Sequence, residues 1–226
     1  MTHSTASADL PLAERTLADL AVSLPGATAL FRAHKLDFCC GGEVPLAKAA
    51  AVRALDLDDL VTALAALDRS AAPELPDDAD ALIDHILARY HEPHRAELPE
   101  LIRLSRRVEA VHRDNPAVPR GLADALEELL AELDSHMQKE EQVLFPMMRA
   151  GGNPMIAHPI ARMRFEHDEH GERIRALEAL TDGCTVPEGA CASWRALYAG
   201  TASLIDDLMQ HIHIENHMLF PRFTGS

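Results

Sequence analysis

The chain lacks long apolar runs and is poor in cysteine, in aromatic residues and in positive charge. No segment approaches the roughly 18 consecutive apolar residues of a membrane-spanning helix, and no basic start precedes an apolar core as in a signal peptide. The four cysteines are too few and too irregularly spaced for a disulfide framework in 226 residues. A formal net charge of -15 argues against nucleic acid or anionic membrane as a partner. We therefore expect a cytoplasmic protein with no nucleic-acid or membrane partner.

Aromatic residues make up 4% of the chain and apolar residues 47%, with Ala and Leu abundant, which favours an all-α fold. Residues 1–11 are small and polar and are expected to fray. Three helical patterns follow, over 16–24, 27–38 and 46–67. Thr16 is the expected N-cap of the first. Because 68–78 contains two prolines and reads as a linker, we predict a small helical domain over residues 1–70.

Beyond the linker the sequence predicts an up-down-up-down four-helix bundle over residues 79–226. Four long helical patterns cover 79–112, 119–150, 155–181 and 188–220. The connectors between them are short, which places consecutive helices antiparallel. Pro93 and Pro99 lie inside the first pattern, and each removes a backbone donor and predicts a bend or a bulge. A helix boundary near Pro93 is the simpler interpretation.

Thirteen histidines are the outlier of the composition, and they point to metal binding. One pattern, His-x-x-x-Glu-x-x-x-Leu-Phe-Pro, occurs twice, at 136–146 and at 211–221. A histidine and a glutamate four residues apart lie on one face of a helix, so each copy can present both side chains to one buried point. A single such pair is usually a surface contact, but two copies in register favour a metal site.

Each copy is preceded by a helical pattern that carries His-x-x-His: His91 with His94, and His167 with His170. Because positions three apart flank the same stripe of a helix, either histidine of a pair could supply a ligand. The minimal predicted ligand set takes the first histidine of each pair and both repeated motifs: His91, His136, Glu140, His167, His211 and Glu215.

Imidazole and carboxylate ligands suit iron, zinc or manganese, and iron fits best. A glutamate can bridge two ions, so Glu140 and Glu215 can hold a metal pair and leave positions open for an oxo or hydroxo bridge and an external ligand. We therefore predict two Fe ions per chain, with a zinc-binding structural bundle as the alternative. The ferritin-like class of di-iron proteins uses paired Glu-x-x-His motifs. Because the one copy here, Glu109 with His112, lies near an expected helix end, that class is disfavoured.

Four further polar residues lie near the predicted ligands. Glu132 lies one turn before a ligand on the same face and could hydrogen-bond to it, and Glu166 precedes another ligand and could line an access path. For both glutamates an exposed salt bridge is an equal alternative. On an ideal helix His213 and His217 point away from the predicted ligand of their helix, so both are expected to face solvent.

Residues 79–221 resemble hemerythrin-like bundles in the doubled His-x-x-x-Glu motif and in the Leu-Phe-Pro that follows it. The whole chain is more similar still to the bacterial iron–sulfur cluster repair proteins. Those pair a small N-terminal domain bearing a Cys-Cys-Gly-Gly motif, here at 39–42, with a hemerythrin-like di-iron domain. The resemblance implies that the six predicted ligands hold two irons, and it selects His91 and His167 from their pairs.

The same resemblance implies a function: repair of iron–sulfur clusters damaged by nitrosative or oxidative stress, by iron supplied from a labile centre. The oxygen carriers of the wider class use five histidines, and the four here should leave the irons more exchangeable. Expected partners are damaged iron–sulfur proteins, nitric oxide or oxygen as small ligands, and a second copy of the chain in a homodimer. Nitric oxide reduction at the same centre, and an oxygen or nitric oxide sensor, are the alternative functions.

Cys39 and Cys40 are adjacent, and because adjacent side chains diverge, the pair is not expected to chelate one metal ion. The two thiols can form a strained, reducible disulfide or act on a partner, while two buried small hydrophobes in a turn are the alternative. The glycines at 41–42 keep the turn open, which favours a redox or iron-transfer role. Cys184, in a connector, and Cys191, at a helix start, are expected to have no chemistry.

Overall fold

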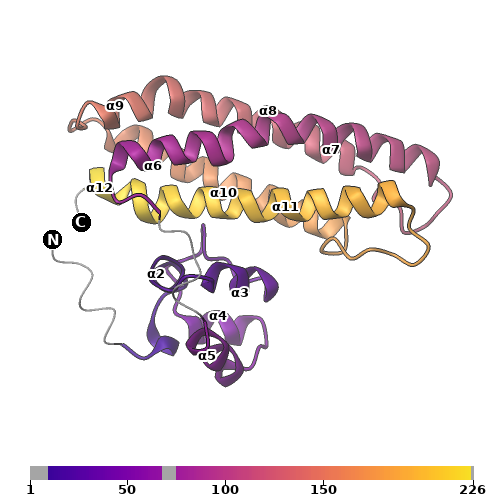
Figure 1. Cartoon of the computed structure of the whole chain (residues 1–226), viewed down its shortest axis with the longest axis horizontal. Coiled ribbons are helices and arrows are strands. Elements are labelled where there is room, and N and C mark those ends of the chain that lie inside the picture. The colour runs from indigo at the N-terminus through magenta and orange to yellow at the C-terminus, as the bar shows by residue number, and fades with distance from the viewer. Residues whose placement is uncertain (1–9, 68–74, 225–226) are drawn as a thin grey trace. The chain divides into compact units, whose positions relative to one another are not determined.

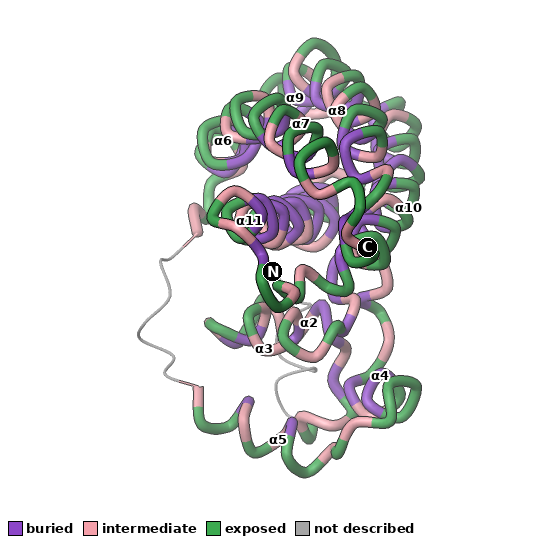
Figure 2. The backbone as a smooth tube through the Cα atoms, turned by 90° about the vertical axis from the view of Figure 1, so that its right-hand side faces the viewer, coloured by how far each residue is buried: buried purple, intermediate pink, exposed green. Residues whose placement is uncertain are grey.

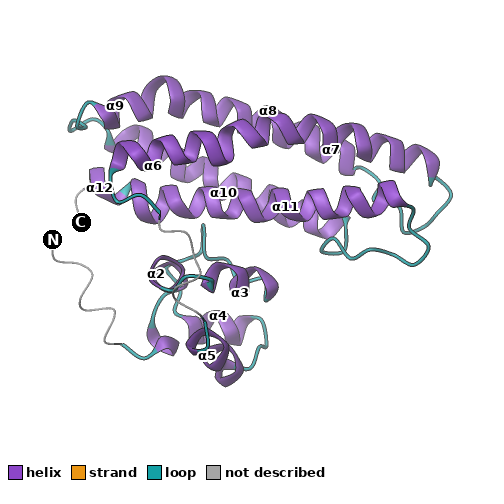
Figure 3. Cartoon of the chain, viewed as in Figure 1, coloured by secondary structure: helices purple, strands orange, loops and turns teal. Residues whose placement is uncertain are grey.

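The computed structural model describes residues 10–67 and 75–224, and every regular element within them is a helix (Figure 3). The all-α prediction is therefore confirmed. Residues 1–9 of the segment predicted to fray, and residues 68–74 of the linker predicted over 68–78, fall outside the described residues. None of the described helices is both long and apolar enough to cross a membrane.

The chain divides into two compact units (Figure 1): one comprises Met1–Leu75 with Ile212–Pro221, and the other Pro76–His211 with Arg222–Ser226. The boundary after residue 211 falls within one continuous helix. That helix, α11 (Ala192–Ile214), runs on without a break into the π-helical segment η4 (Glu215–Leu219). Residues on either side of this boundary therefore belong to one helix.

Between residues 10 and 67, the described N-terminal part of the first unit contains four short α-helices. They are α2 (Leu17–Ser23), α3 (Ala27–Ala33), α4 (Leu46–Val52) and α5 (Leu57–Ala65), after the 3-10 turn η1 (Leu12–Glu14). As expected, Thr16 caps the first, because its hydroxyl accepts a hydrogen bond from the Asp19 amide at 3.1 Å. Phe31 and Phe38 are fully buried, with ring centroids 6.1 Å apart, and form part of the core of the unit.

Two helix predictions in this unit are wrong in extent. The pattern predicted over 46–67 is two helices, because Ala54 has a φ of 53° and Asp56 caps a new start by accepting hydrogen bonds from two following amides. The pattern predicted over 27–38 ends at Ala33, and Lys35 then has a φ of 54°. Left-handed residues of this kind end a helix whatever the hydrophobic period around them.

The second unit is built on long helices that follow the four predicted patterns closely. The elements are α6 (Ala79–Ile86), η2 (Leu87–His91), α7 (Glu92–Val111), α8 (Leu122–Lys139), η3 (Glu140–Leu144), α9 (Phe145–Arg149) and α10 (Ala157–Leu180), with α11 and α12 (Pro221–Thr224) completing the chain. α7 packs on α8, and α8 packs on α10. Buried residues line the faces that these helices turn toward one another (Figure 2).

One glycine lets two of these helices approach closely. A Cβ added at Gly200 in α11 would lie 2.6 Å from Leu101 of α7, which is closer than real contacts allow. Both helices therefore depend on the missing side chain for their spacing.

In the described part of the chain three π-helical segments interrupt the α-helices, and each is followed by one residue and then a proline. The prolines are Pro93 after η2, Pro146 after η3 and Pro221 after η4. In each segment the residue before the proline donates its amide across five residues, as Phe220 does to Glu215 at 2.8 Å. A proline has no amide hydrogen and so cannot donate the hydrogen bond of an α-helical turn. The wider π-helical turn therefore occurs just before each of these prolines.

The interpretation of Pro93 as a helix boundary is wrong, because the chain stays helical from Ala79 to Val111. The alternative prediction for Pro93, a local bulge caused by the missing amide, is confirmed by the widened turn of η2. Pro99 lies inside α7 with no π-helical segment beside it.

Candidate metal centre

The six predicted ligands come from four long helical stretches and are all buried. His136 lies on α8 and His167 on α10, while His211 lies on α11. The other three lie at the ends of π-helical segments: His91 closes η2, Glu140 opens η3 and Glu215 opens η4. Their exposed fractions are 1% or less for His91, His136, Glu140, His167, His211 and Glu215. Two buried carboxylates among four imidazoles are unfavourable unless a cation or protons compensate their charge.

The ligand atoms of the six side chains converge in two groups. Within each group all the atoms lie within 4.8 Å of one another. One group is His91, Glu140, His211 and Glu215, and the other is His136, Glu140, His167 and Glu215. Both glutamates therefore belong to both groups, while each histidine belongs to one. This is the arrangement that two neighbouring ions with two shared carboxylates require.

The distances between facing ring nitrogens fit that interpretation. The Nε2 atoms of His91 and His211 are 3.2 Å apart, and those of His136 and His167 are also 3.2 Å apart. Two nitrogens about 2.1 Å from one ion and at right angles to each other lie ~3 Å apart. The Oε2 atom of Glu140 lies 3.4 Å from the Nε2 of His91 and 3.5 Å from that of His136, so it faces both groups.

Acidic side chains hold two of the histidines by their outer nitrogens. The Nδ1 of His91 lies 2.8 Å from Glu141, and the Nδ1 of His136 lies 2.9 Å from Glu166. Because an ionised carboxylate can only accept, each Nδ1 carries the proton and each Nε2 turns its lone pair toward the ligand group. Both rings are thereby fixed in orientation and in the tautomer that binds a metal.

Basic side chains keep these two carboxylates ionised. Burial opposes the charge on Glu166, but hydrogen bonds from His136, Lys139 and Arg162 outweigh it and hold the pKa of Glu166 well below its usual value. Burial likewise opposes the charge on Glu141, and hydrogen bonds from Arg95 and from the His91 ring lower its pKa.

Sequence reasoning missed Glu141 and Arg95. In the repeated motif the position of Glu141 is occupied by Asn216 in the second copy, so the repeat gave no reason to single it out. Arg95 also binds Asp134 at 2.8 Å, which ties α7 to α8 beside the ligands. Only the packing of these two helices brings the residues together.

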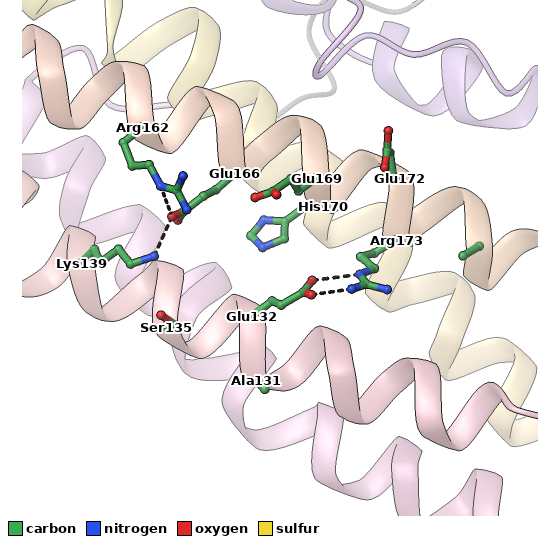
Figure 4. Close-up of a pocket in the computed structure, with 11 residues that line it drawn as sticks. Ala131, Glu132, Ser135, Lys139, Arg162, Glu166, Glu169, His170, Glu172 and Arg173 are labelled. Atoms are coloured by element: carbon green, nitrogen blue, oxygen red, sulfur yellow. Dashed lines mark hydrogen bonds and ion pairs between the residues drawn. The ribbon is translucent and has the colours of Figure 1, made fainter.

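Glu166 and Glu132 both line one pocket, of about 700 Å³, between α8 and α10 (Figure 4). Lys139 and Arg162 flank Glu166 there, and Glu166 connects the pocket to His136. Glu132 instead forms a two-bonded ion pair with Arg173, at 2.5 and 2.9 Å. The structure thus places Glu166 against a predicted ligand and Glu132 in the salt bridge that was its alternative.

The second histidine of each His-x-x-His pair lies beside the ligand groups but outside them. The ring of His94 is centred 5.6 Å from that of His211, and the ring of His170 is 4.9 Å from that of His136. Burial, with the neighbouring histidines, lowers the pKa of His170 to about 2, so its ring is neutral. The residues that converge are the first of each pair, His91 and His167.

The expectation that His213 and His217 face solvent is wrong. His213 is 2% exposed, and its ring lies edge-on to Phe38, with centroids 5.3 Å apart. Burial lowers the pKa of His213 to about 3, with a further contribution from His217. His217 is partly buried, and its Nε2 donates to the Cys39 carbonyl at 3.1 Å. Both contacts lie within the first compact unit.

The prediction that the side chains of Cys39 and Cys40 diverge is also wrong. Their sulfur atoms lie 3.7 Å apart, and the Cys39 thiol lies 3.4 Å from a carboxylate oxygen of Asp37. A hydrogen bond with Cys40 and the burial of Cys39 raise the pKa of the Cys39 thiol. Cys39 is 2% exposed.

Cys191 has a partner that the sequence did not suggest. Its sulfur lies 3.1 Å from the Nε2 of His112, at the start of α11. Hydrogen bonds from the Trp194 amide and from His112 lower the pKa of the Cys191 thiol. All three residues lie in the second compact unit.

Comparison with known proteins accounts for nearly the whole chain. The family model described as Hemerythrin HHE cation binding domain matches residues 82–223, and that of the Domain of Unknown function DUF542 (ScdA_N) matches residues 13–68. The Iron-sulfur cluster repair protein YtfE of Cronobacter sakazakii is 50% identical over 216 residues, which are 92% of this chain and 96% of the relative. The chain belongs to the YtfE family.

Two further relatives show similar coverage. The Iron-sulfur cluster repair protein YtfE of Dickeya chrysanthemi is 47% identical over 92% of this chain and 96% of its own length. The Probable iron-sulfur cluster repair protein of Haemophilus influenzae is 46% identical over 94% of this chain and 98% of its own. The family resemblance that the sequence motifs implied is thus confirmed, and the hemerythrin-like, cation-binding part contains the buried histidine and glutamate groups.

Proposed function

We propose that the protein repairs iron–sulfur clusters damaged by nitrosative or oxidative stress, by supplying iron from a labile, carboxylate-bridged pair of iron ions. One observation carries the proposal: Glu140 and Glu215 each belong to both buried ligand groups. The chain also belongs to a family whose members are named for iron-sulfur cluster repair.

In this proposal His91 and His211 would hold one iron, His136 and His167 would hold the other, and the two glutamates would be shared between them. Four imidazoles and two carboxylates suit iron better than Mg²⁺ or Ca²⁺, which prefer oxygen ligands throughout. When bound, the pair supplies exchangeable iron and positions at which small ligands such as nitric oxide or oxygen can bind.

The surrounding side chains orient the ligands. Glu141 and Glu166 keep their histidines in the metal-binding tautomer, and their ionised carboxylates add negative charge that favours a bound cation. The pocket that Glu166 lines is the proposed access path for iron, because it connects solvent to the side chain that holds His136.

A division of labour between domains is part of the proposal. The bundle predicted over 79–226 would store the iron, and the domain predicted over 1–70 would present Cys39 and Cys40 to the damaged iron–sulfur protein. The two cysteines share a unit with the segment that carries Glu215, since Ile212–Pro221 belongs to the first compact unit.

The repair assay uses the full chain, purified without oxygen and loaded with iron, and an iron–sulfur enzyme whose cluster has been damaged by nitric oxide. We expect the loaded protein to restore the activity of the enzyme, and His136→Ala to lose most of this effect because it removes a ligand. His158→Ala is the matched control, since His158 is exposed on α10 and outside both ligand groups. Equal recovery with His136→Ala and with wild type would refute the proposal.

The metal centre itself is tested by metal content and by low-temperature EPR after partial reduction. We expect about two irons per chain and a coupled mixed-valence signal that Glu140→Ala and Glu215→Ala each abolish, because two ions that share both carboxylates are magnetically coupled through them. Zinc, or a single uncoupled iron, would exclude iron supply from a carboxylate-bridged iron pair. Catalytic formation of nitrous oxide without cluster repair would favour nitric oxide reduction instead.

A further inference from the structure

The loop between α3 and α4 brings three metal-binding side chains together, away from the histidine and glutamate groups. Ligand atoms of Asp37, Cys39 and Cys40 all lie within 4.8 Å of one another. The sulfurs are 3.7 Å apart, and an oxygen of Asp37 lies 3.4 Å from the Cys39 sulfur. All three belong to the first compact unit.

The separation of the sulfurs matches two thiolates on one ion. Two sulfurs at about 2.3 Å from a tetrahedral ion lie ~3.8 Å apart. A disulfide would require the same two atoms to close to about 2.0 Å, which adjacent cysteines reach only with strain. The sulfurs are thus already spaced for an ion, while a covalent bond between them needs a rearrangement of the loop.

The loop is held in this shape by contacts that do not depend on a metal. One oxygen of Asp37 accepts hydrogen bonds from the amides of Cys40 and Gly41, at 3.0 and 3.1 Å. The Cys39 carbonyl accepts from the side chain of Asn216 at 3.1 Å, within the same unit. A Cβ at Gly42 would lie 2.5 Å from the carbonyl oxygen of Phe38, so the turn closes this tightly only with glycine there.

We propose that Asp37, Cys39 and Cys40 form a second metal site, which binds one thiophilic divalent ion such as Fe²⁺ or Zn²⁺. Two thiolates exclude Mg²⁺ and Ca²⁺ as preferred ions. Binding forms two metal–sulfur bonds and one metal–oxygen bond, breaks two S–H bonds and releases two protons to solvent, and no electron is transferred. Three protein ligands leave a fourth position of the ion open, so the ion is exchangeable.

Such a site would bind a metal ion independently of the histidine and glutamate centre. If the protein also supplies iron as proposed above, an open thiolate site is a place from which an ion can pass to the cysteines of a partner by ligand exchange. Binding at the site does not require that role, and either proposal can fail without the other.

Cobalt is the probe, because thiolate ligands give Co²⁺ an intense charge-transfer absorption that histidine and glutamate ligands do not. The full chain, kept reduced and free of oxygen, is titrated with Co²⁺ in weak buffer. We expect the charge-transfer band to saturate at one ion per chain, with release of about two protons per ion bound at the sulfurs. Absence of the band from the wild-type protein would overturn the proposal without any variant.

Variants assign the band to its ligands. Cys39→Ser and Cys40→Ser should each remove most of it, whereas Cys184→Ser with Cys191→Ser should leave it unchanged. Asp37→Asn keeps the oxygen that accepts the amides but loses the charge, and it should weaken cobalt binding by about tenfold or more. A band that survives both Cys39→Ser and Cys40→Ser, in protein with wild-type helix content, would show that the site is elsewhere.

Discussion

At the scale of single residues, the chemistry of the centre depends on carboxylates that do not themselves belong to the ligand groups. Glu166 receives hydrogen bonds from His136, Lys139 and Arg162, so its charge is stabilised from three sides. Glu132 lines the same pocket, and its carboxylate is paired with Arg173. The two glutamates therefore form a matched pair for a test.

Glu166→Gln should weaken metal binding by roughly 10- to 100-fold, as loss of a group that orients a ligand generally does. The reason is that the amide no longer supplies the negative charge that fixes the His136 tautomer. Competition with a chromophoric chelator measures the affinity. Glu132→Gln, which removes one surface ion pair, should change it by less than about twofold; equal losses in the two variants would contradict the assigned role of Glu166.

The pH dependence of alkylation at the Cys191 thiol gives a second prediction for a single residue. Because the Trp194 amide and His112 lower its pKa, more of the thiol is ionised at neutral pH than in an ordinary cysteine. Alkylation at Cys191 should therefore reach half of its maximal rate at a lower pH than an unperturbed thiol, whose pKa is about 8.5. His112→Ala should move that midpoint upward. Peptide mass analysis separates Cys191 from Cys184; an unchanged midpoint would show that the contact has no effect.

The ligand side chains and His213 show what the sequence could and could not predict at this scale. The repeated motif and its upstream histidines predicted the six side chains that converge, because periodicity places them on single faces of helices. The same angular argument turned His213 away from the ligands correctly, yet it assumed that the opposite face meets water. Phe38, far away in the sequence, covers that face instead.

At the scale of elements, the π-helical segments decide where the ligands lie. His91, Glu140 and Glu215 each occupy an end of one, and a proline follows each segment after one residue. Helix-period reasoning assumes a constant rotation per residue, so it predicts the helices but not the extra residue in a widened turn. A local bulge was one of the outcomes predicted at Pro93, whereas the same widening before Pro146 and Pro221 was not predicted.

Pro93→Ala tests the coupling between the proline and the ligand. Alanine supplies the missing amide, so η2 can relax to an α-helical turn, which stabilises the metal-free protein and rotates His91 away from its group. We expect a higher melting temperature without metal and weaker iron binding. Pro99→Ala, in an α-helical part of α7, should raise the melting temperature but leave iron binding unchanged. Full iron binding in Pro93→Ala would show that the widened turn is not needed.

At the scale of the whole molecule, metal binding and stability are linked. Glu140 and Glu215 are fully buried and share both ligand groups, so without a cation two ionised carboxylates there would repel each other and be poorly solvated. A ligand that binds only the folded state at 100 times its dissociation constant adds about 2.7 kcal/mol to the free energy of unfolding. For a chain of this size that corresponds to a rise of about 5–10 °C in melting temperature.

Removal of iron with a chelator should therefore lower the melting temperature of the wild-type protein by about that amount, and added Fe²⁺ should restore it. The double variant Glu140→Gln with Glu215→Gln keeps the size of both side chains but removes their charges. It should melt above the metal-free wild type, since it buries no carboxylate there, and should not respond to iron. Scanning calorimetry with and without iron measures both differences. A double variant that melts below the metal-free wild type would mean that these carboxylates stabilise the fold by themselves, and that the bundle is not built around a cation.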